Sequence, residues 1–150
     1  MTKFRELKIV DFKYEHLKGF VGRKEDQERM IFQDPEGFRQ IVNKSVAYSV
    51  FDGDKLVVCG GVMFLRSGFG EAWFLSTLLI KKYTRQVLKL SLYYLDMIID
   101  KYDLYRVQAT PRINWPSGYK FVERLGFKRE GIMRKYGLNK KDCYMYGRIK

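Results

Sequence analysis

The strongest constraint on the fold is a nearly continuous apolar run at residues 72–80, in the middle of the chain. A strand that is buried on both faces of a sheet has this composition, because neither face meets water. The next segment, residues 84–101, carries apolar side chains at helical spacing along one broad face. A buried strand followed by an amphipathic helix predicts a chain of the α/β or α+β class, with helices packed on a central mixed sheet.

Turn and cap signals delimit the remaining elements. Asp52-Gly53-Asp54 is typical of a hairpin turn, Pro35 and Pro116 of first helical positions, and Gly126 of a left-handed helix end. We expect strands at residues 5–12, 45–51, 55–65, 105–110, 132–138 and 143–149, and helices at residues 14–32 (broken at Gly19 or Gly22), 35–43 and 116–126. With no linker or repeat, the sequence predicts one domain over residues 1–150.

Composition excludes several kinds of site. Cys59 and Cys143 each lie in an apolar or aromatic stretch, which favours two buried free thiols over a disulfide. No Cys-x-x-Cys pair occurs, and His16 is the single histidine, so we expect no metal site and no histidine base. No apolar run reaches the roughly 18–20 residues of a membrane helix, and no secretory signal is evident. We therefore expect a cytoplasmic protein without a membrane partner.

Charge is concentrated in the last third of the chain. The net charge is +12, and residues 101–150 hold 13 basic and 4 acidic side chains, a net of +9. Such a field attracts anions, which include nucleic acid, ribosomes, acidic proteins and phosphorylated cofactors. A solvated basic face that aids solubility explains the same numbers, so both interpretations stay open. The chain is also 16% aromatic, which is compatible with a homodimer.

The closing segment carries the most specific pattern. It consists of Arg106, Asn114, Ser117, the triplet Leu125-Gly126-Phe127, the pair Glu130-Gly131, Arg134, Gly137, Asp142 and Tyr144. In this order the residues resemble the C-terminal half of the GNAT superfamily of N-acetyltransferases, and most of all the branch that acetylates ribosomal-protein N-termini. The resemblance implies the GNAT (acyl-CoA N-acyltransferase) fold, a mostly antiparallel mixed sheet with splayed fourth and fifth strands flanked by helices. It also implies acetyl-CoA as cofactor and a protein or ribosome-like acceptor.

The family habit places the pantetheine arm between the fourth and fifth strands and the pyrophosphate at the start of the following helix. Carried onto this sequence, the cofactor-binding residues are Leu78, Leu79, Ile80, Thr84, Arg85, Gln86, Val87, Leu88, Lys89, Asn114 and Ser117. The family opens that helix with Gln/Arg-x-x-Gly-x-Gly/Ala. Here no glycine occurs between Glu71 and Ser117, and larger side chains would hold the phosphates away. Basic residues from Lys81 to Lys89 would still attract phosphate through their charge.

The resemblance also implies direct attack of an amine on the thioester, with a base or a water chain taking the proton. Glu71, at the start of the fourth strand, is the best candidate base, and Ser76 is a candidate for orienting a water. Val122 occupies the position where many members have a Tyr that protonates the leaving thiolate. Tyr119, one helical turn earlier, is a poorer substitute and completes the candidate catalytic set. Structural roles explain Glu71 and Ser76 better than catalytic roles do.

Three functions therefore remain open at the sequence level. The first is an active N-acyltransferase that uses acetyl-CoA. The second is a catalytically inactive GNAT-fold binding or structural protein, because the chain also resembles short, glycine-poor GNAT-like proteins of tailed phages; this implies the host cytoplasm or the virion. The third is a nucleic-acid binder that uses basic residues interleaved with Tyr136, Tyr144 and Tyr146.

Overall fold

The computed structural model describes residues 6–18, 20, 34–137 and 139–150. Within these ranges one seven-stranded sheet has the order β1-β2-β3-β4-β5-β7-β6. The strands are β1 (Lys8–Asp11), β2 (Ser45–Asp52), β3 (Lys55–Arg66), β4 (Phe69–Ser76), β5 (Arg106–Ala109), β6 (Lys128–Met133) and β7 (Cys143–Ile149). The helices are the 3-10 helix η1 (Tyr14–Leu17) and the α-helices α3 (Pro35–Asn43), α4 (Ile80–Lys101) and α5 (Pro116–Arg124).

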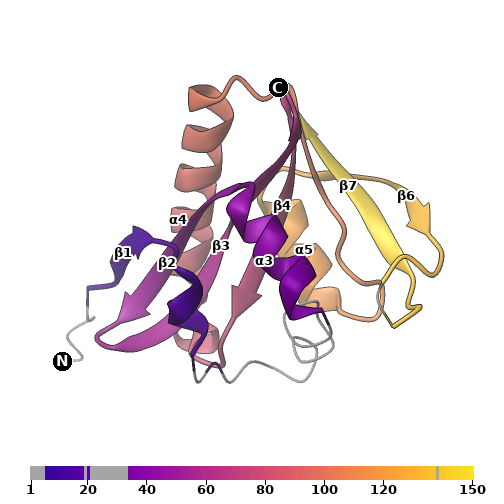
Figure 1. Cartoon of the computed structure of the whole chain (residues 1–150). Coiled ribbons are helices and arrows are strands. Elements are labelled where there is room, and N and C mark those ends of the chain that lie inside the picture. Colours follow the sequence, from indigo (N-terminus) through magenta and orange to yellow (C-terminus); the bar gives the residue numbers. More distant parts are fainter. Residues whose placement is uncertain (1–5, 19, 21–33, 138) are drawn as a thin grey trace.

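All strand pairs but one are antiparallel. The exception is β4 with β5, which run parallel and are paired at only three positions, from Phe69 opposite Arg106 to Glu71 opposite Gln108. Beyond Glu71 the two strands separate, so the sheet opens into a V. In Figure 1 the strands meet near the C-terminus at the top, and β4 and β7 diverge toward the bottom of the view. This is the splayed mixed sheet that the resemblance to the GNAT superfamily implies.

Helices cover both faces of the sheet. Figure 1 shows α4 behind the sheet and α3 in front of it. On the α4 side, Leu95 and Ile98 pack with Val107 and Tyr146, and α5 adds side chains to the same cluster. The opposite side is built from η1 and α3, where Phe38 meets Trp73 of β4 with ring centroids 5.4 Å apart. The expected two-sided burial of the central strand is thereby confirmed.

Several boundaries agree with the sequence signals. Asp34 caps α3, because its carboxylate accepts the Gly37 N–H at 3.0 Å, and Pro35 and Pro116 begin their helices. The predicted hairpin turn has Gly53 at φ +62°, and Gly126 after α5 has φ +91°, where a side chain would be strained. Both cysteines are buried free thiols, as expected.

The end of the central strand was predicted wrongly. We expected strand residues up to Ile80, whereas β4 ends at Ser76 and α4 begins at Ile80. Thr77 causes the change, because its hydroxyl donates to the Leu56 carbonyl at 2.8 Å and accepts the Leu79 N–H at 3.3 Å. The apolar run continues through the turn because Ile80 packs into the core.

The strand before the last hairpin was also misplaced. We expected residues 132–138, but β6 spans Lys128–Met133 and pairs with β7 from Lys128 opposite Gly147. Its charged residues are exposed because β6 is an edge strand, which does not need an apolar face on both sides. Of the helix expected at residues 14–32, the structure describes η1 and the extended residue Lys18; Gly19, Gly22 and most of the remainder lie outside the described residues.

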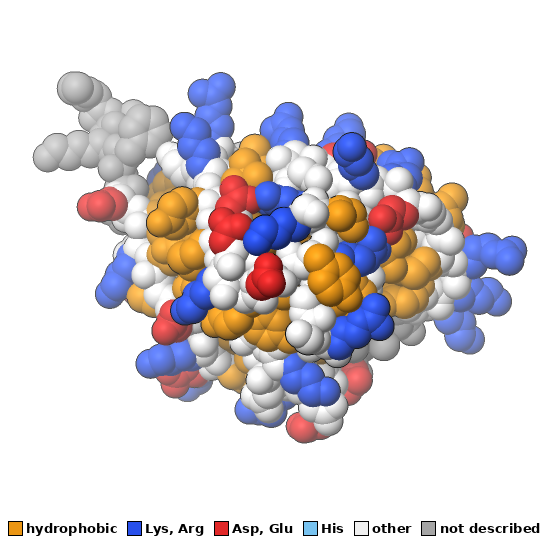
Figure 2. Space-filling model, turned by 90° about the horizontal axis from the view of Figure 1, so that it is seen from above, with side chains coloured by type: hydrophobic (Ala, Val, Ile, Leu, Met, Phe, Trp, Pro, Cys, Tyr) orange, Lys and Arg blue, Asp and Glu red, His pale blue; other side chains and the backbone are white. Residues whose placement is uncertain are grey.

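Charges at the closed end of the V are mixed. Figure 2, which looks onto this end, shows acidic side chains among the basic ones. Arg106 donates two hydrogen bonds to Glu130, at 2.9 and 2.6 Å, and Lys150 lies 3.6 Å from the carboxylate of Asp100. Part of the basic excess is thus neutralised here. In the described part of the chain, no helix is long and apolar enough to cross a membrane.

Candidate functional site

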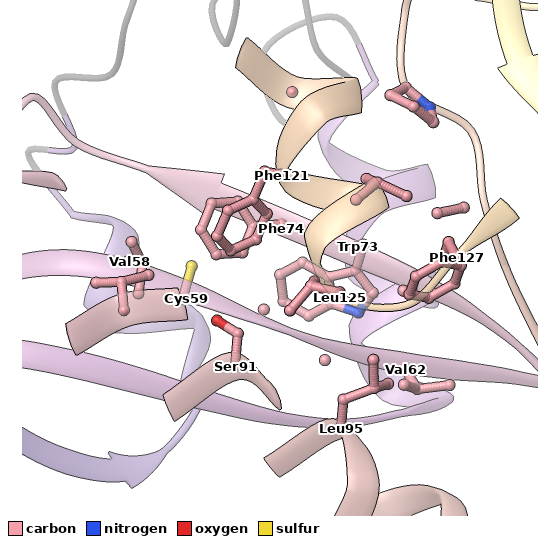
Figure 3. Close-up of a pocket in the computed structure, with 18 of the residues that line it drawn as sticks. Val58, Cys59, Val62, Trp73, Phe74, Ser91, Leu95, Phe121, Leu125 and Phe127 are labelled. Atoms are coloured by element: carbon pink, nitrogen blue, oxygen red, sulfur yellow. The ribbon is translucent and has the colours of Figure 1, made fainter. Parts of the chain in front are cut away.

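A cavity of about 710 Å³ lies where β4 and β5 part. Its walls come from both strands of the V, from α4 and α5, and from β3. Figure 3 shows Ser91 and Leu95 of α4 facing this space, opposite Phe121 and Leu125 of α5, with Val62 on the sheet. The volume is in the range of ligand pockets, and most of the lining is apolar with a few polar groups.

Aromatic side chains shape the wall beside α5. Phe74 of β4 and Phe121 of α5 have ring centroids 4.8 Å apart and lie together in Figure 3. Trp115 is buried at the start of α5, directly against Gly118, where an added Cβ would lie 2.4 Å from the Trp115 ring. Trp73 and Trp115 line the cavity without filling it, so the space between the strands is open.

The edge of β4 inside the V is not covered by another described strand. Between Ala72 and Ser76, β4 pairs with β3 through Val62 to Val58, and no described strand pairs with its other edge. A strand edge presents peptide N–H and C=O groups in a row. An extended ligand with amide groups could therefore pair with this edge while its aliphatic parts lie against Phe74 and Phe121.

One carboxylate stands at the point of the V. Glu71 is partly buried, lines the cavity, and accepts a hydrogen bond from Gln108 Nε2 at 3.1 Å. Burial raises the pKa of the Glu71 carboxyl, and the Gln108 hydrogen bond only partly opposes this shift. Burial, and the Glu71 charge after it, raise the pKa of Tyr136, which also lines the cavity. A carboxylate with a raised pKa in a cavity is suited to accept a proton.

In the turn from β4 into α4, several N–H groups are hydrogen-bonded within the turn itself. Ile80, Lys81 and Lys82 donate their N–H groups to the carbonyls three residues earlier, at 3.2, 3.3 and 3.0 Å. The helix geometry is interrupted at Tyr83, with φ −123° and ψ 22°. The buried Tyr83 hydroxyl donates to Asp52 at 2.5 Å, which fixes this interruption to the β2–β3 hairpin. The N–H groups of residues 80–82 are thus engaged within the turn.

Side chains of the same turn reach the cavity. Lys81 and Thr84 are exposed and line its rim, and Thr84 Oγ1 donates to the Ile80 carbonyl at 3.0 Å. Val87 is buried and lines the interior. Val87 is one of the larger side chains in this turn, and it forms part of the cavity wall.

Solved structures similar to this one are N-acetyltransferases by name. A GNAT-family acetyltransferase from Bacillus anthracis is 18% identical, with a TM-score of 0.69 over 99% of this chain and 96% of that one. A ribosomal-protein-S5-alanine acetyltransferase from Vibrio fischeri is 17% identical, with a TM-score of 0.66 over 99% and 95%. A mutant spermidine N-acetyltransferase from Vibrio cholerae is 13% identical, with a TM-score of 0.71 over 95% and 93%.

The chain has the GNAT fold. The predicted fold class is confirmed by these similarities over nearly the whole chain and by the parallel β4–β5 pair that opens into a V. No model of a protein family matches the sequence, and no curated protein does. Identities below 20% establish the architecture alone, so chemistry has to be argued from the side chains.

The fold brings together only part of the predicted site. Five predicted residues line the cavity: Glu71, Ile80, Thr84, Val87 and Ser117. The others lie outside its lining: Ser76, Leu78, Leu79, Arg85, Gln86, Leu88, Lys89, Asn114 and Tyr119. Ser76 is fully buried, whereas Tyr119 packs against Tyr144 with ring centroids 5.3 Å apart. Their catalytic roles stay predictions.

Sequence reasoning did not select several residues that the GNAT fold places at the cavity. Ser91 and Phe121 follow helical spacing on α4 and α5, so their side could have been inferred once the helices were oriented. Arg112 is buried in the lining just after β5, in a segment that pairs with the start of β7. Tyr136 approaches Glu71 only because the β6–β7 hairpin folds back, and no local signal predicts that contact.

Proposed function

We propose that the protein is an acyl-CoA-dependent N-acyltransferase that transfers an acetyl group from acetyl-CoA to an amine. The observation that carries the proposal is Glu71, a partly buried carboxylate with a raised pKa at the point where β4 and β5 separate beside an open cavity. The acetyltransferase names of the similar structures support the same reaction class.

Glu71 would take the proton from the attacking amine. An amine at neutral pH is mostly an ammonium ion, so a nearby base must remove a proton before its lone pair can attack. The partial burial that raises the pKa of Glu71 makes this carboxylate a stronger base than an exposed one. Gln108 holds it in place through the 3.1 Å hydrogen bond, so that its free oxygen can face the acceptor.

The residues around the V fit the pantetheine part of the cofactor. The edge of β4 from Ala72 to Ser76, which no described strand covers, is suited to hydrogen bonds with amides, and Phe74 and Phe121 offer apolar contact. When bound, acetyl-CoA supplies an activated thioester carbonyl. A peptide N–H on the same β4 edge is suited to donate to that carbonyl oxygen and to stabilise negative charge developing on it.

Phosphate would be held mainly by side chains. Because the N–H groups of residues 80–82 are engaged within the turn, Lys81 and Thr84 at the rim are the nearest polar contacts, with Arg85 exposed beside them. An ammonium group attracts phosphate without the close backbone approach that glycine permits. We therefore expect the affinity for acetyl-CoA to fall as the salt concentration rises.

A second candidate is a GNAT-fold binding protein without catalysis. The observation that favours it is the same internally hydrogen-bonded turn, since backbone donors of residues 80–82 do not point to a phosphate. In this case the cavity would hold another anionic ligand, or the chain would act through its surface.

Calorimetry separates the two candidates. We expect micromolar binding of acetyl-CoA at low salt, and about fivefold weaker binding by Lys81→Ala, because an exposed charge contact contributes up to about 1 kcal/mol. Lys101→Ala is the matched control, since Lys101 is an exposed lysine at the other end of the same helix, roughly 30 Å away. Equal weakening by both variants would assign the effect to net charge alone.

Turnover completes the test. Release of free CoA thiol in the presence of an amine, lost in Glu71→Gln, supports the enzyme. Absence of acetyl-CoA binding at millimolar concentration overturns it. Binding without thiol release from any amine supports the noncatalytic candidate.

A further inference from the structure

The hairpin between β6 and β7 carries a group of basic side chains at the cavity. We define the basic hairpin as residues 134–137 and 139–142. It contains four cations and one carboxylate, a net of +3, and the cations are all exposed: Arg134, Lys135, Lys140 and Lys141. Three residues between them, Tyr136, Gly137 and Asn139, line the cavity. The positive charge is thus placed around one side of the opening.

Hydrogen bonds within the basic hairpin fix this arrangement. The Gly137 N–H donates to the Lys141 carbonyl at 3.0 Å, and the Lys140 N–H donates to the Gly137 carbonyl at 2.9 Å. Asp142 accepts the Lys135 N–H at 2.9 Å, so the single carboxylate of the hairpin supports its backbone. Among the described residues none of the four cations forms an ion pair, unlike Arg106 and Lys150 at the closed end of the V. Their charge is available to a ligand.

Glu71 places a negative charge in the interior of the opening, where Arg112 is also buried in the lining. Glu71 is the one carboxylate among the described residues that line the cavity, and Tyr136 of the basic hairpin lies close enough to feel its charge. A ligand that satisfies both features has a cationic amine at one end and negative charge a few residues behind it. A polycation such as spermidine satisfies the interior and is repelled at the rim.

We propose that the acceptor is a primary aliphatic amine carried on an acidic peptide, with the amine directed to Glu71 and the peptide carboxylates against the basic hairpin. This inference rests on the proposed N-acyltransferase function and names its acceptor class. It differs from the substrate in the name of the spermidine acetyltransferase that shares the fold. A nucleic acid fits less well, because the amines of its bases carry no proton at neutral pH and have no need of a carboxylate.

Competition between matched peptides tests the proposal. Two peptides share length and first residue, and continue with Glu and Asp in one and with Lys in the other; spermidine is the third acceptor. At about 20 mM salt we expect kcat/KM for the acidic peptide to exceed that for the lysine peptide by about tenfold or more, and spermidine to be the poorest. At about 300 mM salt the preference should shrink, because screening shortens the reach of the charges. An acidic peptide with a blocked α-amine and one lysine shows whether the α- or the ε-amine is used.

Charge reversal locates the effect. Lys135→Glu combined with Lys140→Glu should reduce or invert the preference between the two peptides. The matched control is Lys8→Glu combined with Lys101→Glu, which makes the same change in net charge on β1 and at the end of α4. The control pair should keep the preference. Direct binding of the acidic peptide to each variant in the presence of CoA gives the same comparison without turnover.

The outcomes are distinguishable from failure of the proposed function. If peptides are acetylated with equal kcat/KM, or if spermidine is preferred, the acceptor class is wrong while the enzyme stands. If both double variants change the preference equally, the basic hairpin is not the contact. If a short RNA inhibits transfer to the acidic peptide more strongly than a second acidic peptide does, the anionic partner is nucleic acid. Absence of acetyl-CoA binding overturns both proposals.

Discussion

The two sides of the cavity are built in different ways. On one side, the β4–α4 turn (residues 77–84) engages the N–H groups of residues 80–82 internally, holds Tyr83 against Asp52 and contains no glycine. On the other side, the closing half (residues 106–149) uses Gly118 to seat Trp115 and Gly126 to end α5 at φ +91°. The residues that resemble the GNAT superfamily all lie on the second side.

This contrast separates two tasks of the site. The V depends on where β4 and β5 stop pairing, and that point is fixed by the sheet and by the closing half. In the proposed function, contact with an anionic ligand at the rim depends on the β4–α4 turn, which has no glycine. The opening of the V can therefore be retained while the contact with the anionic ligand changes. Variants on each side therefore show whether the two sides contribute separately.

The largest effect on catalysis should come from a change at Glu71, where the two sides of the cavity meet. Glu71→Gln keeps the size and the Gln108 contact but removes the base, so kcat/KM for acetyl transfer should fall about 100-fold. Affinity for acetyl-CoA should stay unchanged, because Glu71 faces the acceptor in the proposed mechanism. Steady-state kinetics with thiol detection and calorimetry measure the two quantities. Unchanged kcat/KM would assign proton removal to another group.

A change on the closing half should damage the cavity itself. In Gly118→Ala the new methyl group would lie 2.4 Å from the Trp115 ring, so this buried side chain must move. We expect a loss of about 1–3 kcal/mol in the free energy of unfolding from overpacking, together with weaker acetyl-CoA binding. Denaturant unfolding and calorimetry check this. Gly131→Ala, where an added Cβ meets nothing within 4 Å, is the control and should leave binding intact.

Loss of the hydrogen bond between Tyr83 and Asp52 should destabilise the β4–α4 turn. Tyr83→Phe removes the hydrogen bond to Asp52 in a buried place, and we expect a loss of about 1 kcal/mol in the free energy of unfolding. If the turn acts independently of the closing half, the double variant with Gly118→Ala should show additive losses. A coupling clearly above about 0.5 kcal/mol would show that the two sides form one cooperative unit.

The sequence predicted those elements well whose ends are set by local signals, and it predicted poorly those whose ends depend on distant contacts. Pro35, Pro116, Gly53 and Gly126 act through local backbone rules, so the elements they delimit were predicted closely. The end of β4 was misjudged because Thr77 bonds to carbonyls of β3, which are far away in sequence. Local composition cannot register such a contact.

The candidate site was predicted only in part for a related reason. Glu71 and Thr84 were found because family habit and charge point to them, and the structure places both at the cavity. The approach of Tyr136 to Glu71 and of Phe121 to Phe74 depends on how β7 and α5 return across the V. These are tertiary contacts between segments that carry no matching signal.

The smallest effect is on the pH dependence of stability. It should differ in sign between two carboxylates, Glu71 and Glu130. The folded-state pKa of Glu71 is raised by burial, so its contribution to stability is fully present below its ordinary pKa of 4.5 and is lost as pH rises through the folded-state pKa. Glu71→Gln does not titrate and should therefore have a higher Tm than the wild type at pH 7. The difference should vanish as pH falls below 4.5.

Glu130 should show the opposite sign. Its pKa is lowered by the hydrogen bonds from Arg106, so its contribution is present above pH 4.5 and is lost as pH falls through the folded-state pKa. Glu130→Gln should thus have a slightly lower Tm at pH 7, with the gap closing in acid, and the exposure of the pair keeps the effect small. Scanning calorimetry across this range measures both variants. The same sign for both would mean that burial does not govern Glu71, and the argument for it as the base would lose its electrostatic support.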